Sequence, residues 1–153
     1  MPSVYTESDF DRLSWHDCRL WRMEVRAGDP EESDWTSDLV LDVDFIVEWV
    51  CAVDVPARFR VAPADLVFHG VTALKVHIDW DGGDQASLHP LSIDRIERRR
   101  VTDQKVYLDR PYYAWTVALN WPQGARIGFG AVGFTQTLRA EPVLTDSQAL
   151  SRR

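Results

Sequence analysis

The sequence predicts an all-β, mainly antiparallel domain, built as a β-sandwich or a partly closed barrel with one or two short helices. Two observations support this fold class. Several segments alternate apolar and polar residues, which is the pattern of a strand with one buried face. Residues typical of turns separate these segments at short intervals, as in antiparallel β proteins. Helical periodicity is scarce by comparison. We expect one domain over residues 1–153.

The first elements are weakly defined. Residues Glu7 to Leu13 have the length for a turn or two of helix, and the segment from Cys18 to Arg26 is a candidate strand. The polar residues from Gly28 to Asp34 then predict one exposed loop. Further weak strand candidates are Phe59 to Val61, Leu66 to His69, Lys105 to Asp109 and Ile127 to Leu138.

The best-defined strand runs from Leu39 to Trp49. Its odd positions are apolar, whereas Asp42, Asp44 and Glu48 occupy even positions, so one face of this strand is expected in the core. The residues from Val50 to Val53 are apolar on both faces. That run predicts a central strand whose far end is covered from both sides.

Two more segments alternate in the same way, Leu74 to Trp80 and Tyr113 to Trp121. Turn residues follow each, and we expect two hairpins whose second strands start near Leu88 and Arg126. The alternation also predicts that Tyr112 points outward. Near the end of the chain, the run from Thr145 to Gln148 is typical of a capping box that opens a short helix.

Composition narrows the function classes. The chain has 17 Lys and Arg against 24 Asp and Glu, a formal net charge of -7, which disfavours nucleic acid and favours a basic partner. The dense basic run from Arg95 to Arg100 predicts a charged edge strand. No apolar run approaches the roughly 20 residues of a membrane span. The first residues show no secretory signal, and the two cysteines, Cys18 and Cys51, fit free thiols, so a cytoplasmic location is expected.

Short motifs carry a family resemblance. They are the stretch from Leu13 to Asp17, the Asp-x-Asp strand from Leu39 to Trp49, the stretch from Val71 to Val76, and the stretch from Gly133 to Gln136. In this order they resemble a group of small uncharacterised bacterial proteins, and the Trp-His-Asp opening is similar to that of the immunity protein 50 family, whose members neutralise cognate toxins. The resemblance implies a cytoplasmic bacterial domain, mainly β, with no catalytic residues to carry over.

The Trp15-His16-Asp17 sequence allows two interpretations. A histidine beside a carboxylate could act as an oriented general base, with Ser14 or Cys18 as nucleophile. On a strand those two residues lie about 6–7 Å from His16, too far for a direct hydrogen bond. The favoured interpretation is a corner, in which Trp15 fills the core while His16 and Asp17 hold an adjoining loop.

The carboxylates of Asp42, Asp44 and Glu48 are expected on one strand face, flanked by Asp79. Like charges at this spacing repel each other unless a cation offsets them. Arginines of the same chain could supply that cation, as could a basic protein partner or a divalent metal. The leading hypothesis is that this acidic face binds a basic protein.

Two alternatives remain open. His77 and Asp79 share one strand face, and with His89, or else His69 or His16, they would form an incomplete metal site. The aromatic hairpin carrying Trp115 and Trp121 could instead line a cavity for a small ligand.

The sequence therefore favours a non-enzymatic, immunity-like protein-binding domain over a metal-dependent enzyme or a small-ligand binder. It predicts neither a cofactor nor a membrane partner. The oligomeric state stays open, and a homodimer formed through a strand edge is one of the alternatives.

Overall fold

In the described part of the chain, ten strands form one antiparallel sheet that is not closed into a barrel. This computed structural model describes residues 3–80 and 88–152. The strands run in the order β1-β9-β4-β3-β2-β6-β7-β8-β5, with β10 paired to β4 beside this path. The elements are β1 (Val4–Thr6), η1 (Glu7–Arg12), β2 (Arg19–Ala27), η2 (Pro30–Glu32), β3 (Ser37–Val50), β4 (Arg58–His69), β5 (Thr72–His77), β6 (Leu91–Val101), β7 (Tyr112–Leu119), β8 (Arg126–Ala131), β9 (Gly133–Leu138) and β10 (Val143–Thr145).

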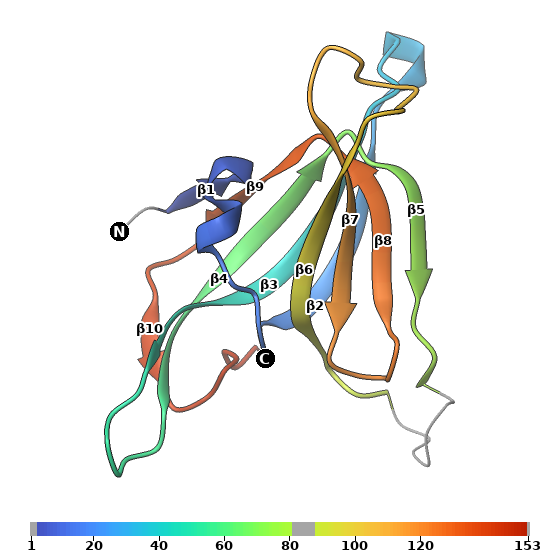
Figure 1. Cartoon of the computed structure of the whole chain (residues 1–153). Coiled ribbons are helices and arrows are strands. Elements are labelled where there is room, and N and C mark those ends of the chain that lie inside the picture. Colours follow the sequence, from blue (N-terminus) through green and yellow to red (C-terminus); the bar gives the residue numbers. More distant parts are fainter. Residues whose placement is uncertain (1–2, 81–87, 153) are drawn as a thin grey trace.

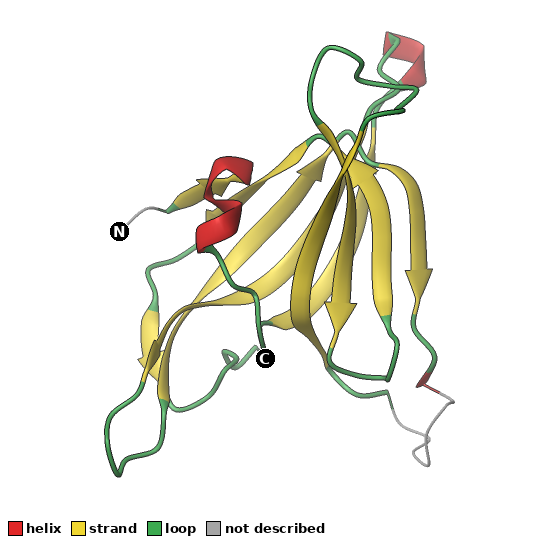
Figure 2. Ribbon diagram, in the orientation of Figure 1, coloured by secondary structure: helices red, strands yellow, loops and turns green. Residues whose placement is uncertain are grey.

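The sheet bends so that its two halves face each other, as expected for a sandwich (Figures 1 and 2). One half contains β1, β9, β4, β3 and β2, and the other contains β6, β7, β8 and β5. Residues Arg19 and Leu20 at the start of β2 pair with both β3 and β6, so this short segment joins the halves. The predicted all-β fold class is confirmed.

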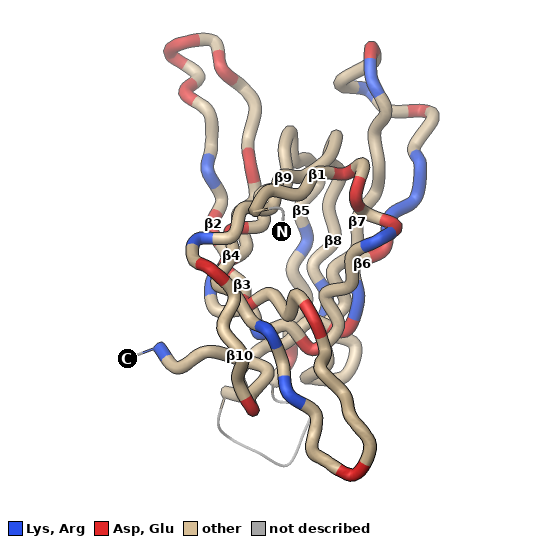
Figure 3. Tube along the Cα trace, turned by 90° about the vertical axis from the view of Figure 1, so that its left-hand side faces the viewer, with Lys and Arg blue, Asp and Glu red and all other residues tan. Residues whose placement is uncertain are grey.

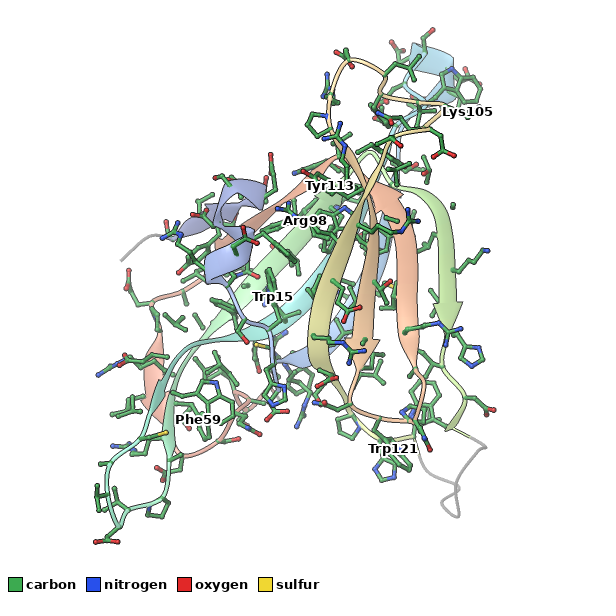
Figure 4. All side chains as sticks on the ribbon, viewed as in Figure 1. Trp15, Phe59, Arg98, Lys105, Tyr113 and Trp121 are labelled. Carbon is green, nitrogen blue, oxygen red and sulfur yellow. The ribbon has the colours of Figure 1, made fainter. Side chains whose placement is uncertain are left out.

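Side chains from both halves fill the space between them. Trp115 on β7 is 1% exposed and packs edge-on against Phe68 of β4, with ring centroids 5.2 Å apart. Trp15 enters the same core from the corner before β2 (Figure 4). Its indole Nε1 donates a hydrogen bond of 2.8 Å to Oε1 of the buried Gln136. The core thus depends on aromatic rings whose polar atoms have partners inside it.

Strand β3 is central, as predicted, because it lies between β2 and β4. The prediction that the far end of this strand, Val50 to Val53, is covered on both faces was wrong. Residues 39–46 are all buried, whereas Cys51 and Val53 are exposed. The reason is that β3 and β4 continue beyond the other strands as a projecting hairpin, visible at the lower left of Figure 1.

One of the two predicted hairpins forms. Strand β7 pairs with β8 through the turn at Trp121, and Ala118 faces Arg126. Strand β5 does not pair with β6; it pairs with β8, and its other edge has no strand partner among the described residues. The turn proposed from Asp81 to Asp84 falls outside the described residues.

Three smaller predictions were wrong. Tyr112 is 5% exposed because the ring of Tyr107 stacks on it and its hydroxyl meets that of Thr72. The Lys105 to Asp109 segment is a loop, since Tyr107 has a left-handed φ of 53°. The predicted helix at Thr145 to Gln148 does not form: Thr145 ends β10, and residues 146–148 form bends in which the Thr145 hydroxyl accepts the Ser147 N–H.

The helices are short 3-10 segments, and η1 lies within the predicted Glu7 to Leu13 region. The other weak strand candidates overlap β2, β4, β8 and β9. No helix in the described part of the chain has the length and apolar character needed to cross a membrane.

The environments of the two thiols predict different reactivity. Cys18 is buried, and burial raises its pKa to about 12, whereas Cys51 is exposed. Because the thiolate is the reactive form, a thiol reagent should modify one cysteine per native chain and two after denaturation. The Cys51→Ser variant should show no rapid reaction. Rapid modification of Cys18 in the native protein would contradict this arrangement.

Candidate functional site

A segment near the end of the chain covers the outer face of β2 and β3. We call residues 146–152 the strap. Its Gln148 Nε2 donates to Asp17 Oδ2 at 3.0 Å, and its Leu150 N–H donates to Asp44 Oδ2 at 2.8 Å. Its Arg152 reaches both Asp42 and Asp44. The strap thereby brings together three of the residues singled out from the sequence.

The guanidinium of Arg152 is enclosed by three side chains, which we call the arginine cage: Trp21, Asp42 and Asp44. Nη1 donates to Asp42 Oδ2 at 2.7 Å, and Nη2 donates to Asp44 Oδ1 at 2.6 Å. The guanidinium carbon lies 4.8 Å from the centroid of the Trp21 ring. The Trp21 Nε1–H donates to Asp44 Oδ2 at 2.8 Å, so ring and carboxylate hold each other in place. Paired carboxylates and an aromatic face are the groups that bind a guanidinium best.

A second arginine, Arg139, also pairs with Asp42. Arg139 donates to Asp42 Oδ1 at 2.9 Å and to Asp65 Oδ1 at 2.5 Å. Burial opposes ionisation of Asp42, but the hydrogen bonds from Arg152 and Arg139 outweigh it and hold its pKa below the usual value. Asp42 is therefore a carboxylate at neutral pH.

These contacts show that the expectation of an open acidic face on β3 was wrong. Asp44 has no exposed surface and Asp42 is 8% exposed, so a partner meets arginines of the chain itself at this position. The intramolecular ion pairs, one of the alternatives left open by the sequence, are present.

Glu48 and Asp79 do not join this cluster. A β-bulge between Ile46 and Glu48 interrupts the alternation of β3, and Glu48 pairs with Arg60 at 3.0 Å. Asp79 follows β5, which lies at the far end of the strand order and does not neighbour β3. The prediction of one continuous acidic face was wrong at both residues.

The Trp15-His16-Asp17 corner has the form that the sequence favoured. Trp15 is 3% exposed and belongs to the core, so it is unavailable to a partner. His16 Nδ1 lies 3.1 Å from the carbonyl oxygen of Asp94. Asp17 adopts a left-handed φ of 64° and accepts the Asn120 Nδ2–H at 2.9 Å, in addition to its bond from the strap. The corner fastens β2 to the β6 half of the sheet.

The alternative of a catalytic His16 lacks a nucleophile. The Cys18 sulfur accepts the Ile46 N–H at 3.4 Å inside the core, and its raised pKa leaves it protonated at neutral pH. The Ser14 hydroxyl lies 3.4 Å from the His16 backbone nitrogen rather than on its ring.

The histidines are dispersed. Within residues 3–80 and 88–152, no three His, Cys, Asp or Glu side chains gather closely enough to hold a metal ion. His77 is exposed near the end of β5, His89 packs edge-on against Trp121, and His69 Nε2 contacts the Thr135 hydroxyl at 2.9 Å. The proposed set of His77, Asp79 and His89 is therefore not assembled.

A cavity of about 420 Å³ lies at the turn after β7, near Trp121, which Figure 4 labels. We call it the Trp121 cavity. Its lining mixes the aromatic ring with polar groups and includes part of the strap: Asp17, Arg19, His89, Pro90, Ser92, Trp121, Gln148 and Ala149. Its size is within the range of small-ligand sites. Trp115, the other aromatic residue proposed for this role, belongs to the core instead.

A second acidic region lies in the loop between β2 and β3, which was predicted to be exposed but was not singled out as a binding site. We call residues 29–35 the acidic tip. Asp29, Glu31, Glu32 and Asp34 are all exposed there, and Trp35 is 79% exposed. No Lys, Arg or His of the described chain forms an ion pair with these four carboxylates. The upper left of Figure 3 shows the tip projecting beyond the sheet.

A simple signal could have revealed this region. Between Arg26 and Arg58 the sequence contains nine carboxylates and no lysine or arginine. On β3, Arg139, Arg152 and Arg60 pair with carboxylates of that stretch, whereas the carboxylates of residues 29–34 form no ion pair with the described residues.

The tip has a defined conformation. Asp29 Oδ1 accepts the Glu31 N–H at 3.0 Å at the start of η2. Asp34 accepts both the hydroxyl of Thr36 and its N–H, which lower the Asp34 pKa. Gly28 closes the loop, because a Cβ there would lie 2.5 Å from the Thr36 carbonyl oxygen. Trp35 is thus presented on an ordered loop.

No protein-family model, curated protein or solved structure matches this chain.

We expect two substitutions that each remove one strap contact, Arg152→Ala and Arg58→Ala, to lower the free energy of unfolding by different amounts. Arg152→Ala leaves the fully buried Asp44 without its cation and should lower the free energy of unfolding by about 2–3 kcal/mol, less than a fully buried pair because Arg152 is partly exposed. Arg58→Ala, the matched control, breaks only the exposed pair with Asp146 and should cost at most about 1 kcal/mol. Chemical denaturation measures both, and equal losses would contradict the cage.

Proposed function

We propose that this chain is a non-enzymatic protein-binding domain that recognises a basic protein through the acidic tip. The observation that carries the proposal is the combination, on one ordered loop, of a highly exposed Trp35 and four carboxylates that form no ion pair with the described residues. Carboxylates of this kind attract a basic partner over distance, and tryptophan is the residue type most enriched among binding hot spots.

The order of the tip supports this role. A loop that already holds its bound conformation loses little conformational entropy when a partner docks. The hydrogen bonds from Thr36 to Asp34 fix the turn next to Trp35, so its indole ring is presented on a fixed backbone. The arrangement favours fast, salt-sensitive association.

The resemblance to the immunity protein 50 family supports a particular class of basic partner, a toxin. If the chain shares the role of that family, the basic partner is a toxin that the domain neutralises by covering it. A neutralising domain of this kind needs a binding surface and no catalytic group.

The test compares charge variants in capture from native cell extract. The tagged wild-type chain should retain one basic protein at low salt and release it at moderate salt. Glu31→Lys with Glu32→Lys should lose that protein, and with the purified partner should slow association about tenfold or more. Trp35→Ser should mainly accelerate dissociation, because it removes the hot spot rather than the charge.

The matched control is Asp11→Lys with Glu141→Lys, which changes the net charge equally at two exposed carboxylates away from the tip. This control should retain the partner. If both charge variants lost it equally, net charge rather than the tip would govern binding. Retention of the partner by the tip variant would contradict the proposal.

The Trp121 cavity supports a second candidate function, binding of a small polar aromatic ligand. Arg19, His89 and Ser92 converge there beside an indole ring. A thermal-shift screen of small aromatic carboxylates should then find compounds that stabilise the wild-type chain and not Trp121→Ala. Failure to find any stabilising compound, or equal stabilisation of the variant, would argue against this function.

A further inference from the structure

We infer that the arginine cage is an exchangeable guanidinium-binding site, and that an arginine-bearing peptide segment of another protein can replace the strap in it. This site is separate from the acidic tip and goes beyond the function proposed for it. The structure already shows the cage holding a guanidinium, that of Arg152, between two carboxylates and an indole ring.

The cage itself belongs to the rigid part of the molecule. Asp42 and Asp44 lie in the middle of β3, which pairs with β2 on one side and β4 on the other. The indole of Trp21 is fixed by its hydrogen bond to Asp44. The two carboxylate groups and the ring therefore keep their positions when the occupant changes, as a preformed site requires.

The occupant is held far less firmly than the cage. None of the residues 146–152 is buried, and they form no helix or strand. Apart from Arg152, the strap is attached by single hydrogen bonds from Gln148 and Leu150, by the exposed pair of Asp146 with Arg58, and by the Leu150 side chain, which is only partly buried against the core. Segments with few buried contacts open locally without global unfolding. The strap thus acts as an intramolecular competitor that another arginine must displace.

The cage specifies arginine rather than a cation in general. Two separate Nη groups bind two different carboxylates while the guanidinium carbon lies over the indole ring of Trp21. A lysine ammonium cannot span both carboxylates and stack at the same time. Displacement of the strap would also remove Gln148 and Ala149 from the wall of the Trp121 cavity, so the two sites are linked.

The experiment uses the full chain with Arg152→Ala and a synthetic peptide of residues 146–152. NMR titration that follows the Trp21 indole N–H should show at least tenfold tighter peptide binding to the variant than to the wild type. Peptides in which lysine or citrulline replaces the arginine should bind at least tenfold more weakly than the parent peptide. Adding Trp21→Leu to the variant should also weaken binding. The Glu31→Lys, Glu32→Lys chain should behave like the wild type, which separates this test from that of the tip.

A second measurement needs no variant. If the strap opens on its own, the Leu150 amide of the wild-type chain should exchange its hydrogen at least a hundredfold faster than the amides in the middle of β3. Equal exchange rates of the Leu150 amide and the β3 amides would overturn the inference. Equal binding of the arginine and citrulline peptides would also overturn it, as would the absence of peptide binding to a folded Arg152→Ala variant. A wild-type dimer that Arg152→Ala abolishes would identify a second copy as the occupant and overturn the assignment to another protein.

Discussion

The structure depends on a carboxylate group that has no contact with water. Asp44 lies in the middle of the longest strand with no exposed surface, and a buried charge of this kind is tolerated only when it is paired and hydrogen-bonded. Arg152, the Trp21 indole and the Leu150 N–H meet that requirement together. Because Asp44 needs these partners, the strap crosses β2 and β3 and covers the outer face of the sheet there.

The negative charge of the chain is therefore divided into two kinds. On β3, Asp42 and Asp44 are neutralised by arginines that lie about a hundred residues away in the sequence. At the tip of the β2–β3 hairpin the carboxylates have no such partner in the described chain, and their field extends into solvent. The first kind contributes to the fold, and the second is available for recognition. Net charge alone does not separate the two.

Periodicity predicted the strands well because alternation reports which face of a strand is buried, and β3 and β7 show it clearly. It could not predict which strands become neighbours, so β5 was assigned to the wrong partner. Tyr112 and the Lys105 to Asp109 segment were misassigned because Tyr107 adopts a left-handed conformation and covers Tyr112. The candidate site was predicted only in part: Asp42 and Asp44 were identified, but their pairing with Arg139 and Arg152 is a long-range contact that spacing does not encode.

The first and last strands also constrain how the chain acquires its fold. Strand β1 pairs with β9, where Val4 faces Thr137, so the first strand has no partner until most of the chain has been synthesised. The strap joins later still, after β10. Contacts between residues so far apart in sequence slow folding. On the ribosome, the edge of β4 therefore stays open until β9 is synthesised, and Asp42 and Asp44 lack Arg152 until residue 152 emerges. Binding by a chaperone during this period would protect the nascent sheet from aggregation.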